Sequence, residues 1–185
     1  MVTKRLVKPL TGSKEKDEGI TVKATRQVVF EDDISDLLRK RFFLFSPKIN
    51  STEMFYLQCW KVLLKYSVAY FKETRADRGS IEFIVDPIKG SAANEEKIDL
   101  SLIKKSIPSA LISEKKLSKE RAEKKAIVDA RWKVLLSKFK RPPELEVVSV
   151  DVFYRPYYKV DTICGSKEGI QWIPADDFGN YFVYN

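Results

Sequence analysis

Two segments of the chain alternate apolar and polar residues. The first passes through Ile81, Phe83 and Val85, and the second passes through Ile170 and Trp172. Successive side chains of a β-strand point to opposite faces, so this spacing predicts two strands that each bury one face.

A third segment, 54–71, is apolar on almost every side. This pattern fits a strand buried on both faces, and it fits about as well a long buried helix with Ser51 or Thr52 as its N-cap. A related segment further along contains Pro156, and a helix interior does not tolerate proline. The comparison favours a strand over 54–71.

These segments belong to a repeated pattern. The shared residues are Phe55-Tyr56, Trp60-Lys61-Val62, Asp86 and Gly90 in the first copy, and Phe153-Tyr154, Tyr158-Lys159-Val160, Asp176 and Gly179 in the second. Each copy predicts an aromatic strand, a polar turn, a second strand and an Asp-to-Gly turn. The polar turns are expected at 73–79 and 164–169, where each ends in a glycine that tolerates positive φ.

Each predicted hairpin follows a helical pattern. Ser118 is a suitable N-cap for the second helix, and Pro142-Pro143 ends it. Asp32 or Asp33 caps a shorter first helix that ends before Pro47. We also expect a strand over 21–30, a polar linker at 92–97 and a short helix within 100–111.

The second helix has two apolar stripes, so we expect it to be covered, most simply by the sheet. The stripes are Ile127, Ala130 and Val134, and Val128, Trp132, Leu135 and Phe139. Together these elements predict an α+β fold of two related helix-plus-β-hairpin units, with antiparallel strands in one sheet or two and the helices packed on one face. The expected boundaries are a basic N-terminal arm over 1–19, a first unit over 20–97 and a second over 98–185, and the two units could form one continuous domain.

The second unit carries a recognisable order of features. Ser118-x-x-x-Ala122 opens its helix, strands follow, and Asp176-x-x-Gly179 closes it. This order resembles the peptidase propeptide, or PepSY, domain over about a third of the chain, with a degenerate copy ending at Asp86 and Gly90 in the first half. Family members are usually secreted or membrane-tethered, whereas no export signal is visible in this sequence. The resemblance implies a small helix-on-sheet module that binds and does not catalyse.

The composition reduces the range of possible chemistry. The chain has 185 residues, 44% of them hydrophobic, and contains no His, so the usual general base and the commonest metal ligand are absent. Neighbouring carboxylates such as Asp32 and Asp33 diverge on any regular element and do not make an acid–base pair. We expect no enzyme activity, no cofactor and no metal site; Asp86 and Asp176 are the equivalent carboxylates worth testing. Two cysteines, Cys59 and Cys164, are either free thiols or a single bridge.

The net charge of +8 is concentrated in one segment. The segment 101–145 contains thirteen Lys and Arg and five acidic residues, so it accounts for the whole excess of positive charge. Lys124, Arg131 and Lys138 recur every seven residues and form a ridge along the predicted helix, where Lys133, Lys140 and Arg141 add further charge. The ridge could follow a phosphate backbone, or it could be an ordinary solvated helix face.

The function predicted from these patterns is non-enzymatic binding, as a regulatory or assembly module that contacts other proteins or a second copy of itself. Exposed edge strands near 154–160, with Tyr154, Tyr157 and Tyr158, are the expected partner-binding segment. The alternative is a nucleic-acid-binding protein that uses the basic helix over 115–141. No signal-peptide core is visible and Gln58, Lys61 and Lys65 interrupt the most apolar segment, so we expect a cytoplasmic protein without a membrane span.

Overall fold

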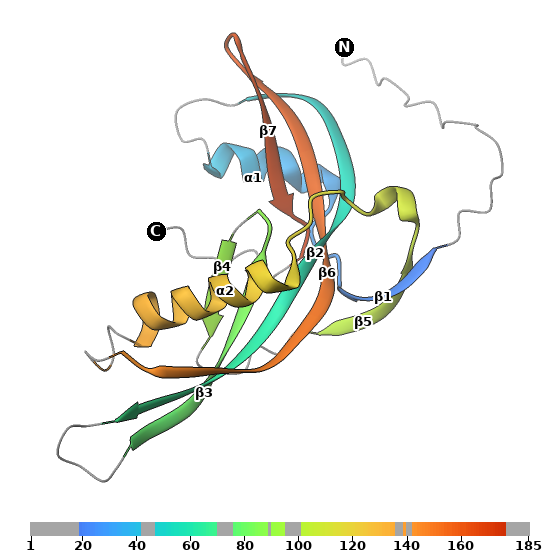
Figure 1. Cartoon of the computed structure of the whole chain (residues 1–185). Coiled ribbons are helices and arrows are strands. Elements are labelled where there is room, and N and C mark those ends of the chain that lie inside the picture. The colour runs from blue at the N-terminus through green and yellow to red at the C-terminus, as the bar shows by residue number, and fades with distance from the viewer. Residues whose placement is uncertain are drawn as a thin grey trace, which may run out of the picture.

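The structure is a computed structural model that describes residues 19–41, 47–69, 76–88, 90–94, 101–135, 139 and 142–176. Most of these residues lie in strands (Figure 1). The strands are β1 (Ile20–Thr25), β2 (Lys48–Ala69), β3 (Ala76–Asp86), β4 (Gly90–Asn94), β5 (Leu102–Ile107), β6 (Glu144–Cys164) and β7 (Lys167–Pro174). The helices are α1 (Ile34–Arg41) and α2 (Lys119–Asp129), with 3-10 turns at Glu31–Asp33 and Ser109–Leu111 and a π-helical continuation at Ala130–Leu135.

Two long antiparallel strands, β2 and β6, form the centre of a seven-stranded sheet. The strand order is β4-β3-β2-β6-β1-β5, and β7 also pairs with β6. β1 runs parallel to β6 where Ala24 meets Tyr154, so the sheet is mixed. In Figure 1 the two long strands run side by side, with β7 at one end and β3 and β4 at the other. The strands of both predicted units therefore lie in one sheet.

The predicted α+β fold of helix-plus-hairpin units, with helices packed on one face, is wrong. The described residues form a seven-stranded mixed sheet with two α-helices. A helix-plus-hairpin unit would place α1 on the hairpin that follows it, β2–β3. Instead, Ile34 and Leu38 of α1 pack with Tyr158, Val160 and Ile173 of β6 and β7.

The second helix also packs mainly on the strands of the other predicted unit. Ala122 and Ala126 of α2 pack with Val62, Phe83 and Val85 of β2 and β3. The amphipathic pattern of a helix shows that one face must be buried, but it does not specify which strands bury it. For that reason the periodicity predicted these two helices but not the strands on which they mainly pack.

Several local predictions are confirmed. The segment 54–71 is a strand as far as Ala69, within β2. The second helix begins after Ser118, whose Oγ accepts a hydrogen bond from the Arg121 N–H at 3.3 Å. The first helical segment is present too, from Glu31–Asp33 through α1 to Arg41. Its predicted cap, Asp32 or Asp33, is wrong: the N-cap is Phe30, and Asp33 inside the segment accepts a hydrogen bond from the Phe30 N–H.

Other local predictions are wrong. The helix expected within 100–111 is mainly the strand β5, because β1 offers it a complete antiparallel partner, from Ile20 paired with Ile107 to Thr25 paired with Leu102. The linker expected at 92–97 is a strand, β4, as far as Asn94, and 95–97 lies outside the described residues. The strand expected over 21–30 ends at Thr25.

The predicted turns also differ. Gly79 is not the end of a turn but a strand residue that pairs with Tyr66. In the second hairpin the turn is made by Gly165 and Ser166, and Gly165 has φ of +62°. Gly169, expected to end that turn, pairs with Thr162 inside β7.

Candidate functional site

The centre of the sheet holds a buried cluster of charged side chains. Arg155, in the middle of β6, is fully buried. Its Nη1 donates to Asp86 Oδ2 at 3.0 Å. Its Nε and Nη2 donate to Asp176 Oδ2 and Oδ1 at 2.9 and 2.6 Å, a bidentate geometry that makes strong charge-assisted hydrogen bonds.

The two carboxylates reach Arg155 from opposite sides of the central strand pair. Asp86 is the last residue of β3, which pairs with β2, and Asp176 follows β7, which pairs with β6. The sequence indicated these two aspartates as equivalent positions, and the structure brings them together on one guanidinium. Arg155 itself was missed, although a lone charge inside an aromatic strand is a signal that a buried partner is needed.

Neighbouring groups satisfy the remaining lone pairs of both carboxylates. Asp86 accepts hydrogen bonds from the Tyr157 hydroxyl, from the Ile88 N–H at 2.7 Å and from the Cys59 thiol at 3.4 Å. Asp176 accepts one from Thr25 Oγ1 at 2.6 Å. The cluster is therefore built from five parts of the chain, and its charged groups are hydrogen-bonded as burial requires.

The protonation of the cluster is governed mainly by burial. Burial raises the pKa of the Tyr157 hydroxyl well above its usual range, and it raises the pKa of the Cys59 thiol, with Asp86 adding to this effect. Burial opposes the charge on Arg155, but the hydrogen bonds that Arg155 donates to Asp176 and the nearby negative charges together outweigh it, so the pKa of Arg155 is raised. At neutral pH the cluster thus contains a neutral tyrosine, a neutral thiol and a charged guanidinium.

These protonation states and this burial describe a structural cluster. A neutral buried thiol is a poor nucleophile, and a substrate would have to open the sheet to reach any of these groups. Cys59 and Cys164 are both free, so the single bridge that the sequence left open does not form. Within the described ranges, no three His, Cys, Asp or Glu side chains gather in a way that could hold a metal ion.

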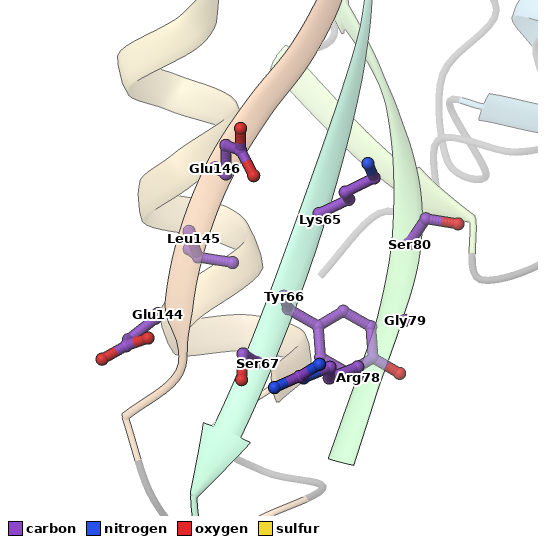
Figure 2. A pocket seen from close by; sticks show the side chains of 9 residues that line it. All are labelled: Lys65, Tyr66, Ser67, Arg78, Gly79, Ser80, Glu144, Leu145 and Glu146. Atoms are coloured by element: carbon purple, nitrogen blue, oxygen red, sulfur yellow. The ribbon is translucent and has the colours of Figure 1, made fainter. Parts of the chain in front are cut away.

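An open cleft of about 810 Å³ lies at the far end of the sheet (Figure 2). Consecutive residues of three neighbouring strands line it, namely Lys65, Tyr66 and Ser67 of β2, Arg78, Gly79 and Ser80 of β3, and Glu144, Leu145 and Glu146 of β6. Its charges are mixed: the two glutamates project from β6, and the two basic residues belong to β2 and β3. Such a surface has no excess of one charge that would select a particular ligand.

The predicted partner-binding tyrosines are not on an exposed edge. Tyr157 and Tyr158 are buried and Tyr154 is half-buried. From Tyr157 to Val160, β6 is paired with β2 on one side and with β7 on the other. The prediction of exposed edge strands near 154–160 is therefore wrong. An aromatic, amphipathic sequence is found in central strands as well as in edge strands, so the pattern does not show which of the two a strand is.

The predicted basic ridge is only partly described. Lys124 and Arg131 are exposed, and the backbone of Lys133 lies in the π-helical continuation of α2. Lys138, Lys140 and Arg141 lie outside the described residues. A π-helical turn contains more residues than an α-helical turn, so the seven-residue spacing does not continue unchanged past Ala130.

Two large apolar side chains are exposed on the same helix. Val128 is 52% exposed and Trp132 is 63% exposed, although both belong to a stripe that the sequence predicted to be covered. The helix buries instead a narrow row of small residues, Ala122, Ala126 and Ala130. Lys124 and Val128 are four residues apart on α2, and Arg131 and Trp132 follow Val128 by three and four residues in the π-helical continuation. All four are exposed, and we call the surface that they form the outer face of α2.

In the part of the chain that the structure describes, no helix combines the length and the apolar character needed to cross a bilayer. No protein-family model, no curated protein and no solved structure matches this chain, so the PepSY resemblance stays a prediction.

Proposed function

We propose that this chain is a non-enzymatic binding module that contacts an acidic protein partner through the outer face of α2. The observation that carries the proposal is the exposure of Trp132 and Val128 beside Lys124 and Arg131. Trp and Arg are the residue types that most often dominate the energy of protein interfaces. The apolar pair would supply buried contact area, and the cations would select negative charge.

The charge distribution supports the choice of an acidic partner. The whole net charge of +8 resides between 101 and 145, and α2 lies within that segment. Complementary charge steers association and rejects partners of the wrong sign. We also propose a cytoplasmic location, which the free thiols of Cys59 and Cys164 support because structural disulfides are rare in that compartment.

Peptide selection on the intact chain tests this proposal. A display library of random peptides should yield peptides that combine Asp or Glu with apolar residues, and Trp132→Ala or Arg131→Glu should weaken their binding by about tenfold or more, as expected for loss of an interface hot spot. Phe30→Ala and Arg39→Glu are the matched controls, since Phe30 is an exposed aromatic residue and Arg39 an exposed arginine outside α2. Equal binding by Trp132→Ala and the parent would contradict the proposal.

The second candidate function is nucleic-acid binding, which the exposure of Lys124 and Arg131 favours. Fluorescence anisotropy with a single-stranded oligonucleotide would separate the two functions. A nucleic-acid binder loses affinity by orders of magnitude as salt rises from about 50 to 200 mM. Replacing Lys124, Arg131 and Lys138 with Glu would then abolish binding, whereas no binding at low salt would remove this candidate.

A further inference from the structure

The pairing of β2 with β6 has an internal symmetry. Leu57 and Arg155 occupy equivalent positions of the repeated pattern, each two residues after a Phe, and they pair directly with each other. When two antiparallel strands are equivalent, the pair formed by one residue and its own counterpart marks a two-fold axis. The axis suggested by the register therefore passes through Leu57 and Arg155.

The irregularities of the two strands obey the same relation. Asn50 is the extra residue of β2 between the pairs Ile49 with Thr162 and Ser51 with Asp161. Val148 is the extra residue of β6 between the pairs Leu64 with Val147 and Leu63 with Ser149. Each bulge lies five residues before the Phe of its repeat, Phe55 or Phe153. A bulge is a specific feature of a strand, so the coincidence of two bulges is independent support for the axis.

The outer strands follow this relation approximately. β3 pairs with the second part of β2 and β7 with the second part of β6. Trp60 and Tyr158 are equivalent in the repeat and pair with Val85 and Ile173 respectively. Asp86 comes one residue after Val85, whereas Asp176 comes three residues after Ile173. Asp176 is thus displaced along the strand direction, which places it level with Arg155 for the bidentate contact.

We propose that the hairpins β2–β3 and β6–β7 are equivalent halves related by this pseudo-two-fold axis, and that Arg155, at the axis, couples them into one cooperative folding unit. Arg155 binds a carboxylate from each half, Asp86 and Asp176. Loss of either carboxylate leaves guanidinium N–H groups of Arg155 without their buried acceptor, so damage to one half is transmitted to the other. The packing of α1 on β6–β7 and of α2 on β2–β3 joins the halves a second time.

Tryptophan reporters in the two halves test the coupling. Trp60 lies in β2, where its Nε1 donates to the Leu117 carbonyl oxygen at 2.7 Å, and Trp172 lies in β7 beside Phe55 and Tyr157. With exposed Trp132 changed to Phe, two full-length variants retain either Trp60 or Trp172 as the single reporter. Urea unfolding followed by fluorescence should give one shared midpoint for both reporters.

Asp176→Asn should then lower both midpoints by the same amount, although Asp176 follows β7. Glu168→Gln, an exposed change on β7, is the matched control and should move neither midpoint. A shift confined to the Trp172 reporter would show that the halves unfold separately and would overturn the proposal.

A milder variant keeps the test decisive if Asp176→Asn does not fold, and a combined variant adds a second test if it does. Thr25→Val removes only one hydrogen bond from Asp176 and should produce a smaller shift that is again equal at both reporters. Asp86→Asn and Asp176→Asn together should shift the midpoint by an amount that differs from the sum of the single shifts, because both act on Arg155. Strictly additive shifts would overturn the role of Arg155.

Discussion

Arg155 is a charged residue that an apolar strand accommodates by supplying it with two carboxylates. Burying an ion pair costs desolvation energy that the mutual attraction of the charges only partly recovers, so the pair is weak evidence for net stability. Removing Arg155 is different, since it leaves two buried carboxylates without the cation they share, and breaking a buried pair in this way costs about 3–5 kcal/mol. The cluster therefore makes the fold specific for the arrangement in which β3 and β7 both end at Arg155.

Tyr157→Phe measures how much one neutral hydrogen-bond donor of the cluster contributes to stability. It removes the hydroxyl that donates to Asp86, and we expect the free energy of unfolding at pH 7 to fall by about 1–3 kcal/mol, the usual effect of leaving a buried acceptor with one donor fewer. Urea unfolding monitored by circular dichroism measures this change. An unchanged free energy would mean that another donor replaces the hydroxyl.

The same variant has a defined pH dependence. Because burial raises the pKa of Tyr157 in the folded state, the unfolded chain loses its tyrosine proton first, at about pH 10. The stabilising contribution is complete below that pH and is lost as the pH rises further. The free energy of unfolding should thus decline less steeply between about pH 9.5 and 11 in Tyr157→Phe than in the parent. Equal slopes would contradict the folded-state shift.

The charged cluster shows which residues of a buried site can be predicted from the sequence. Asp86 and Asp176 could be selected because they recur in a repeated pattern. Their convergence could not be predicted, since it depends on β3 and β7 flanking the central strands on opposite sides. Tyr157 and Cys59 belong to the cluster because the strand register places them beside Asp86. Residue type alone does not predict that register.

At the scale of elements, β3 contains a glycine whose position depends on its cross-strand neighbour. Gly79 pairs with Tyr66, and a Cβ built on Gly79 would lie 2.5 to 2.9 Å from the hydroxyl and ring atoms of Tyr66. Figure 2 shows the Tyr66 ring extending towards Gly79. The aromatic ring occupies the space that a side chain at position 79 would need, so glycine here serves packing rather than a turn.

Gly79→Ala should destabilise the protein by about 1–3 kcal/mol, the range typical of overpacking. Gly169→Ala is the matched control, because a Cβ there would meet only Thr162 Oγ1 at an ordinary 3.7 Å, and its effect should stay within about 0.5 kcal/mol. Thermal unfolding of both variants measures the difference. Equal stability of the two variants would show that Tyr66 moves aside without cost.

The helices show how far local patterns extend. The N-cap at Ser118 and the helical segment before Pro47 could be predicted, because capping and proline effects act within one turn. β5 was mistaken for a helix because its strand character depends on β1, which is remote in sequence. The exposure of Val128 and Trp132 was missed because small residues on the opposite side of α2 already fill the contact with the sheet.

For the whole molecule, the free edge at the start of β6 is a feature that the fold must control. In the described residues, no strand pairs with the outer side of β6 before Tyr154. That segment carries exposed Glu144, Glu146 and Asp151, and a bulge at Val148. Charges and bulges are the usual protection of an edge against pairing with another chain.

Replacing Glu144 and Glu146 with Thr should therefore promote self-association. Multi-angle light scattering should show oligomers or aggregates at concentrations where the parent shows none. Asp32→Thr with Asp36→Thr removes the same charge from the exposed start of the first helical segment and controls for the change in net charge. If both double variants associate equally, net charge rather than edge protection is responsible.

The sequence by itself determined some local features, namely the helix that begins after Ser118 and the placement of the net charge within 101–145. For 54–71 it favoured a strand over a helix without deciding between them, and the structure shows a strand as far as Ala69. These features depend on side-chain periodicity, capping and composition, all of which act over a few residues. Only the tertiary structure decided that β2 pairs with β6, that α1 and α2 each cover the hairpin of the other half, and that Arg155 holds Asp86 and Asp176. The physical reason is that strand pairing and helix docking join segments distant in sequence. Many pairings would bury the same apolar residues, and fewer of them also place each buried charge next to a hydrogen-bonding partner.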